Sequence, residues 1–288
     1  MHDLPAPALP RPGALPRVRG GRQPPGLTVA LLVIVTVLGS AVLGAFWTPY
    51  DPNQPDFRVR LIAPSAAHPL GTDHFGRDLL SRIMAGAANA LLVGAVDVGV
   101  AFTLGGLVGV AAGFAGGWLD ELLMRPSDAL AAFPPILLAL LGAAIIGPGW
   151  FSSMLAIGLA NVPAFARVAR GSTLAVRGLE YVESARALGA TRARIVWRHL
   201  VPNILAPQLV LATVAFATAI LAEAALSYLG LGTQPPTASW GRMLREAQTF
   251  IALSPYPTIF PGLAIVFTVL GWNLFGDGLR DLLDPRTR

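Results

Sequence analysis

The sequence predicts an all-α membrane protein with six transmembrane helices and both termini in the cytoplasm. Of its 288 residues, 54% are hydrophobic and only 13% are charged, whereas a soluble domain carries about 25% charged residues. Several apolar stretches approach the ~20 residues that a helix needs to cross a ~30 Å hydrocarbon layer. Arginines gather between these stretches on one expected side, as the positive-inside rule requires.

The N-terminal 26 residues contain seven prolines and four arginines. Such a composition cannot bury enough apolar surface to fold, so residues 1–26 are expected to form a disordered cytoplasmic tail. The apolar run 27–47 is longer than the ~7–15-residue core of a signal peptide, and no clear small-residue cleavage site follows it. We therefore expect it to be the first transmembrane helix.

Five further apolar stretches predict the remaining spans, which are 90–114, 129–146, 151–168, 204–228 and 258–275. Residues 48–89 would form an extracytoplasmic loop, and 90–288 a core of five transmembrane helices with a cytoplasmic loop at 169–203 and an extracytoplasmic loop at 229–257. This topology places 15 of the 21 arginines inside and six outside, which supports cytoplasmic termini.

Both extracytoplasmic loops are expected to contain a surface helix. In the first, Thr72 or Asp73 would cap a helix in which Asp73 pairs with Arg77 and Asp78 with Arg82. The second would follow the Pro235-Pro236 turn. Its apolar face would consist of Trp240, Met243, Leu244, Ala247 and Ile251.

Several classes of function are disfavoured by what the sequence lacks. It contains no lysine and no cysteine, which excludes a Walker A lysine and any cysteine-ligated metal. The arginines form no single basic face with stacking aromatics, so a nucleic-acid partner is not expected. His68, His74 and His199 match no metal-binding spacing, and no catalytic motif such as H-E-x-x-H or G-x-S-x-G occurs. We expect a non-catalytic chain without metal or cofactor.

Residues 178–203 form the most informative segment. Helix-favouring residues run from Glu180 to Leu188, Gly189 is a suitable stop, Thr191 is a suitable N-cap, and Pro202 is expected to end a second helix. A stiff helix–turn–helix elbow of this kind would convert a push at its tip into a tilt of the adjoining spans. The alternative is a solvated charged loop that only maintains the positive-inside bias.

The same segment resembles the EAA signature of bacterial importer permeases, which reads EAA, three residues, Gly, nine residues, I-x-L-P. Glu183, Ala185, Gly189 and Pro202 match it, while Ser184, His199 and Val201 depart from it. Residues 68–82, 221–244 and 260–286 also resemble the C-type permease subunit of dipeptide, oligopeptide and nickel importers. The resemblance extends from about residue 60 to the end of the chain.

This resemblance implies a multi-pass permease of the bacterial inner membrane with the MetI-like fold of type I ABC importers. It implies that the cargo is a peptide or a related small solute and that membrane lipids surround the chain. It also implies three kinds of protein partner, which are a second homologous permease subunit, two ATP-binding subunits that hold ATP and Mg²⁺, and an extracytoplasmic solute-binding protein. Glu183, Ala185 and Gly189 would then contact an ATP-binding subunit. Arg186, Arg192 and Arg194 are added from expected exposure alone, and the coupling set is completed by Ser184, Thr191 and Pro202.

Two carboxylates lie inside predicted spans, Asp97 and Glu223. An ionised carboxylate there costs at least ~2.5–3.5 kcal/mol unless it finds a partner or water, so both are candidates for the translocation pathway. Internal hydrogen bonding is the alternative for each, and for Asp97 a position near the lipid headgroups is another. Gly105, Gly109 and Gly113 form a small-residue stripe that favours close helix packing. A secondary transporter driven by an ion gradient remains the alternative function, although no inverted repeat is evident.

Overall fold

A computed structural model describes residues 25–283, and within this range the chain is helical without strands. The major helices are α1 (Pro25–Phe46), α2 (Leu79–Val100), α3 (Gly106–Ala115), α4 (Gly117–Ala131), α5 (Pro135–Ile146), α6 (Trp150–Arg177), α7 (Glu180–Ala187), α8 (Arg192–Ile195), α9 (Val201–Leu229), α10 (Trp240–Ala247) and α11 (Tyr256–Leu283). Five helices, or six if a bent pair counts as one, are long and apolar enough to cross a membrane. The predicted all-α membrane fold is confirmed.

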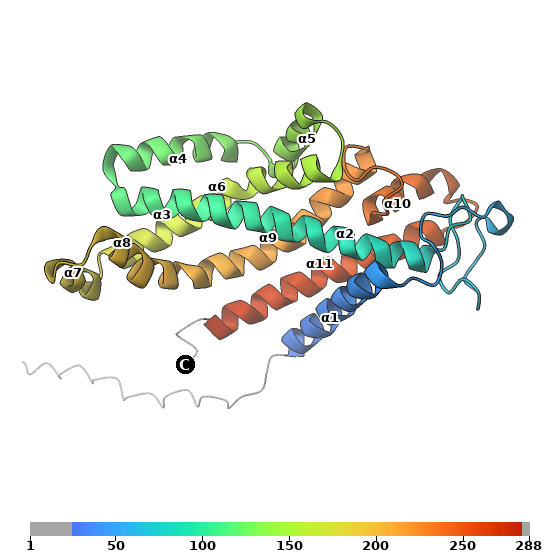
Figure 1. The fold of residues 1–288 in the computed structure, drawn as a ribbon, viewed down its shortest axis with the longest axis horizontal. Helices are drawn as coiled ribbons and strands as arrows, with labels where there is room; N and C mark the ends of the chain where they lie inside the picture. Colours follow the sequence, from blue (N-terminus) through green and yellow to red (C-terminus); the bar gives the residue numbers. More distant parts are fainter. Residues whose placement is uncertain (1–24, 284–288) are drawn as a thin grey trace, which may run out of the picture.

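The long helices run side by side along the longest axis of the molecule (Figure 1). Helix α6 packs against α2, α3, α5 and α9, while α1 packs against α2 and α11. The loop before α2 lies at one end of the bundle, and α7 and α8 lie at the opposite end. The expected tail falls outside the described residues, except that Pro25 and Gly26 belong to α1.

Two π-helical segments join shorter helices into long ones. The segment η2 (Ala101–Gly105) connects α2 to α3, and η3 (Val196–Leu200) connects α8 to α9. The resulting helices contain 37 and 38 residues, or about 55 Å at 1.5 Å per residue. Because the hydrocarbon layer is only ~30 Å thick, each helix extends well beyond it.

The third predicted span is not one straight helix. Helices α4 and α5 meet at a bend of 92°. Pro134 is extended, with φ −56° and ψ 131°, and Pro135 begins the next helix. A proline disfavours helical backbone in the residue before it and is well tolerated in a first helical turn, so the consecutive prolines end one helix and start another.

The expected surface helix near residue 72 is also wrong. Gly71 and Gly76 have φ of 81° and 79°, which are conformations that interrupt a helix. The helix begins instead at Leu79, where the Asp78 carboxylate accepts a hydrogen bond from the Ser81 N–H at 2.8 Å, and it continues into the second span. Asp78 is therefore an N-cap and does not pair with Arg82.

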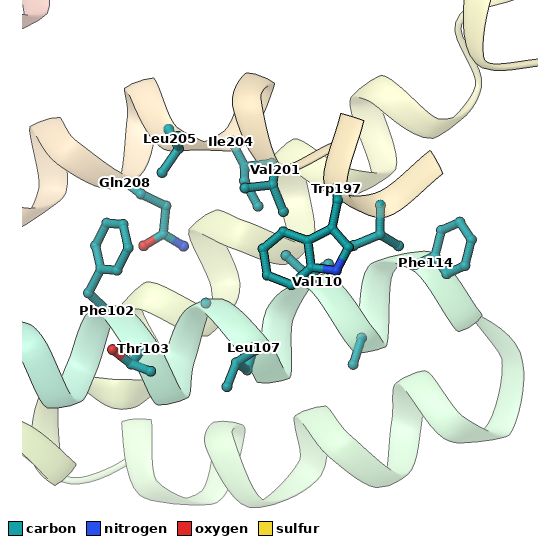
Figure 2. A pocket seen from close by; sticks show the side chains of 13 residues that line it. Phe102, Thr103, Leu107, Val110, Phe114, Trp197, Val201, Ile204, Leu205 and Gln208 are labelled. Carbon is teal, nitrogen blue, oxygen red and sulfur yellow. The ribbon is translucent and has the colours of Figure 1, made fainter. Parts of the chain in front are cut away.

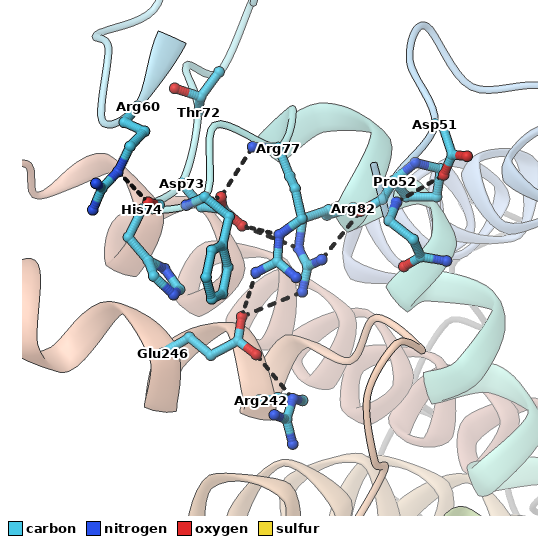
Figure 3. Close-up of polar contacts among 12 residues, drawn as sticks. Asp51, Pro52, Arg60, Thr72, Asp73, His74, Arg77, Arg82, Arg242 and Glu246 are labelled. Carbon is cyan, nitrogen blue, oxygen red and sulfur yellow. Dashed lines mark hydrogen bonds and ion pairs between the residues drawn. The ribbon is translucent and has the colours of Figure 1, made fainter. Parts of the chain in front are cut away.

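A charged cluster links this loop to α10 (Figure 3). Arg77 Nε lies 2.7 Å from Asp73 Oδ2, and Arg77 Nη2 lies 2.7 Å from Glu246 Oε2. Arg242 Nε lies 2.9 Å from Glu246 Oε1. Burial would raise the pKa of Glu246, but Arg82 and Arg77 outweigh it and hold the pKa below its ordinary value. The cluster stabilises the loop against α10.

Candidate metal ligands occur in this cluster, because Asp73, His74 and Glu246 offer atoms that lie within 4.8 Å of one another. Guanidinium groups already contact both carboxylates, so a metal cation would meet strong repulsion.

Helix α10 itself packs against α9 and α11 and buries Trp240, Met243 and Ala247. Leu244 is half-buried, but Ile251 lies beyond the helix and is exposed.

Candidate functional site

Helices α7 and α8 form the elbow at one end of the bundle. Helix α7 ends in a tight turn in which Gly189 has φ 81°. The N–H of Ala190 donates to the Ala185 carbonyl, and the N–H of Gly189 donates to the Arg186 carbonyl, both at 3.0 Å. These two bonds are the Schellman pattern, which requires a left-handed residue that glycine adopts without strain.

The second arm of the elbow begins as predicted but does not end as predicted. The Thr191 hydroxyl accepts a hydrogen bond from the Arg194 N–H at 3.3 Å, which makes Thr191 the N-cap of α8. Pro202 does not end this helix. The preceding π turn, closed by the Val201 N–H and the Val196 carbonyl, shifts the hydrogen-bond register just before the proline, and the chain continues as α9.

A small apolar core holds the elbow together. Val182 of α7, Ile195 of α8 and Leu200 of η3 are buried, and they pack with Phe114 at the end of α3 and Val176 near the end of α6. The elbow is therefore fixed to the ends of two other helices. A force applied to it is transmitted to α3, α6 and α9, because close-packed interiors transmit strain.

Most of the predicted coupling residues lie on the outer surface of the elbow. Ala185 is half-buried, whereas the others are exposed, namely Glu183, Ser184, Arg186, Gly189, Thr191, Arg192 and Pro202. Arg194 is exposed as well. His199, which departs from the EAA pattern, is half-buried with its ring 5.8 Å from that of Tyr181. The elbow thus accommodates the imidazole by packing it against an aromatic ring.

Sequence reasoning missed Leu188, which lies at the tip of the elbow and is 88% exposed. This places an apolar side chain at the outermost turn of the elbow, where another protein can reach it. Its position directly before Gly189 was a usable signal, since a leucine in a sharp surface turn has nothing within its own helix to pack against.

The two intramembrane carboxylates are buried among polar groups of the same chain. Asp97 accepts hydrogen bonds from the Asn161 amide at 3.1 and 3.3 Å. Glu223 accepts from Ser227 at 2.6 Å and from Thr233 at 3.1 Å. Both side chains have internal partners, as the alternative interpretation expected. Contact with a solute stays a prediction for each.

The glycine stripe packs against α6. A Cβ on Gly105 would lie 2.6 Å from Phe165 Cβ, one on Gly109 would lie 2.2 Å from the Ala166 carbonyl oxygen, and one on Gly113 would lie 2.9 Å from Thr173 Cβ. Glycine is required for this approach, since real Cβ contacts are not this short. The expected packing role is confirmed, and the neighbour is a helix of the same chain.

An apolar groove that the sequence did not predict lies between α3 and α9, next to the elbow. Its volume is about 440 Å³. Figure 2 shows Phe102, Thr103 and Gln208 at one end and Trp197 and Phe114 at the other. Because its lining comes from segments about 100 residues apart in sequence, no local pattern could have revealed it.

Comparisons with known proteins place this geometry in context. Residues 105–288 match the family described as binding-protein-dependent transport system inner membrane component. A dipeptide transport system permease protein of Alkalihalophilus pseudofirmus is 42% identical, over 90% of this chain and 86% of that protein. A probable D,D-dipeptide transport system permease of Escherichia coli K12 is 41% identical, over 90% and 88%.

A third relative is a glutathione transport system permease protein of Pectobacterium atrosepticum, which is 42% identical over 91% of this chain and 86% of that protein. Among solved structures, the inward-facing MetNI methionine ABC transporter matches with a TM-score of 0.57 and 20% identity, over 70% of this chain and 96% of that one. At this identity the match establishes a shared fold.

Proposed function

This chain belongs to the binding-protein-dependent transport system inner membrane components, and we propose that its elbow is the contact through which separate ATP-binding subunits drive solute import. As a member of this family it is a non-catalytic permease subunit of an ABC importer and a multi-pass inner-membrane protein. The proposed cargo is di- or oligopeptides or a related small solute, as the names of its relatives suggest.

The proposed assembly contains a second homologous permease subunit, two ATP-binding subunits that hold ATP and Mg²⁺, and an extracytoplasmic binding protein that delivers the solute. In this arrangement the elbow end of the bundle and both termini lie in the cytoplasm. The opposite end, with the charged cluster around Glu246, faces the binding protein.

The single observation that carries this proposal is the construction of the elbow. Its turn is fixed by two backbone hydrogen bonds at Gly189, its interior is packed against the ends of α3 and α6, and its tip exposes Leu188. A solvated loop would need none of these features. A stiff element with an apolar tip can instead seat in a partner and pass that partner's motion to the membrane helices.

The alternative of a secondary transporter driven by an ion gradient is set aside. Such a transporter has no use for a stiff cytoplasmic elbow, and its family would not be that of binding-protein-dependent systems. Asp97 and Glu223 are retained as candidate pathway residues only for conformations that separate them from their internal partners.

The test uses the complete importer in proteoliposomes and measures ATP hydrolysis with and without the solute-loaded binding protein. Glu183→Arg reverses a charge on the outer surface of α7, and Gly189→Pro removes the N–H that closes the turn and forbids its positive φ. Both should abolish the stimulated hydrolysis while helix content and complex yield remain normal.

Glu180→Arg is the matched control, because it makes the same charge change on α7 outside the motif. It should retain most of the stimulation. Normal stimulated hydrolysis in both elbow variants would remove the coupling role.

A further inference from the structure

We infer that the groove between α3 and α9 is a solute subsite, in which a neutral peptide packs its side chains against apolar walls and donates one backbone N–H to Oε1 of Gln208. This inference rests on the proposed function and deepens it by naming where the solute binds in this chain and through which group.

The groove has the size and character of a small-molecule site. Helices α3 and α9 both pack on α6, and the space between them measures about 440 Å³, within the ~300–1,000 Å³ typical of ligand sites. None of its lining residues is charged, and most of the wall is apolar. A transport subsite should bind weakly enough to release its solute, and a wall without charges meets that requirement.

Gln208 supplies the polar contact. Its side chain is 2% exposed, and its Nε2 donates to the Phe165 carbonyl of α6 at 3.2 Å. This bond fixes the orientation of the Gln208 amide, because Nε2 carries hydrogens to donate to the carbonyl oxygen and Oε1 carries none. Among residues 25–283, Oε1 has no hydrogen-bond partner, and an unpaired buried acceptor is unfavourable. A donor that reached it would remove that cost.

The occupant that fits best is a small solute. An acyl chain offers no hydrogen-bond donor, and polar residues in spans face the bundle interior or a cavity instead of lipid. A contact with a second transmembrane helix would favour small residues. The lining of this groove instead includes the large side chains of Phe102, Leu107 and Trp197. A peptide provides both apolar side chains and N–H donors.

The groove is also placed where the elbow can act on it. Phe102 and Thr103 belong to η2, and Val196 and Trp197 belong to η3, so each wall includes a π segment. Such segments occur frequently at functional sites. Figure 2 shows the Gln208 amide extending from α9 toward α3 beside Phe102. Oε1 is closed off in this conformation, so a shift of α9 relative to α3 is needed to present it to the solute.

The first measurement uses the natural lack of cysteine. Leu107→Cys places the only thiol of this chain in the groove, and Leu141→Cys places one on α5, outside it, at similar exposure (61% and 57% for the native leucines). The complete importer in proteoliposomes is labelled with a methanethiosulfonate reagent during turnover. Neutral alanine di- and tripeptides that the wild type accumulates should protect the thiol at 107 and leave the thiol at 141 unprotected.

The second measurement is the KM of ATP-driven uptake of those peptides. Gln208→Leu should raise it about 3- to 10-fold, the effect of losing one neutral hydrogen bond. A peptide methylated on its amide nitrogen should lose the same factor with the wild type and show no further loss with Gln208→Leu.

Two results would overturn the subsite while leaving the importer intact. One is an unchanged KM in Gln208→Leu together with an unprotected thiol at 107. The other is cross-linking of that thiol to the second permease subunit throughout the cycle, which would assign the groove to a subunit interface. Absence of ATP-driven uptake of every peptide by the wild type would instead remove the proposed peptide cargo, and this inference with it.

Discussion

Gly109→Ala should destabilise the packing of α3 on α6 more than its single methyl group suggests. The added Cβ would lie 2.2 Å from the Ala166 carbonyl oxygen, 2.6 Å from Ala169 Cβ and 2.8 Å from the Arg170 nitrogen. None of these atoms can rotate away, because all are backbone or Cβ atoms. The two helices must therefore separate.

The expected magnitude follows from two opposing terms. Overpacking a close contact costs typically ~1–3 kcal/mol, while replacing glycine by alanine inside a helix returns up to ~1 kcal/mol. With the overpacking cost taken as about 2 kcal/mol, the net loss is about 1–2 kcal/mol, which corresponds to a fall in Tm of about 2–8 °C for a chain of this size. Thermal unfolding of the purified permease in detergent measures it.

Gly99→Ala is the matched control, since a Cβ there meets nothing within 4 Å. This variant should be as stable as the wild type or slightly more stable. If Gly109→Ala unfolds at the same temperature as Gly99→Ala, the close approach of α3 to α6 is not required and the reasoning fails.

Two further predictions concern the charged cluster and the link between the elbow and the groove. In the folded protein the pKa of Glu246 lies below its unfolded value near 4.5, so the ionised carboxylate stabilises the fold at pH values above 4.5. This stabilisation is lost as the pH falls through the lower, folded-state pKa. Glu246→Gln should therefore flatten the acid limb of the unfolding curve, and an unchanged acid limb would contradict the role of the cluster. Separately, Leu188→Ala and Gln208→Leu should be non-additive in the KM and maximal rate of peptide uptake. Sites more than ~10 Å apart ordinarily add within ~0.5 kcal/mol, so strict additivity would mean that the tip of the elbow and the groove act independently.

How much the sequence could predict depended on how local the determining interactions are. The bounds of α7, the turn at Gly189 and the cap at Thr191 are decided by neighbours in sequence, and these predictions are confirmed. The bend between α4 and α5 was also encoded locally, by Pro134-Pro135, but the apolar run obscured it.

The parts that could not be predicted depend on distant residues. Asn161 lies 64 positions from the Asp97 that it contacts, and Asn89 lies 134 positions from Glu223. Periodicity says where a carboxylate lies along a span and cannot say which amide a neighbouring helix brings to it. The same applies to the π segments, whose hydrogen-bond register no local pattern specified.

The continuity of the helix from Arg192 to Leu229 gives the elbow and the groove a common mechanical element. Gln208 lies 16 residues beyond Arg192, or about 24 Å along a helix, and its bond to Phe165 holds α9 against α6. If α9 pivots near that bond, a displacement of ~2 Å at the elbow corresponds to a tilt of only ~5° over this length. A small tilt changes the separation of α9 from α3 most at the elbow end, where Trp197 covers the groove. The groove would then open from the elbow inward, and the unpaired oxygen of Gln208 would be the last part of it to be exposed.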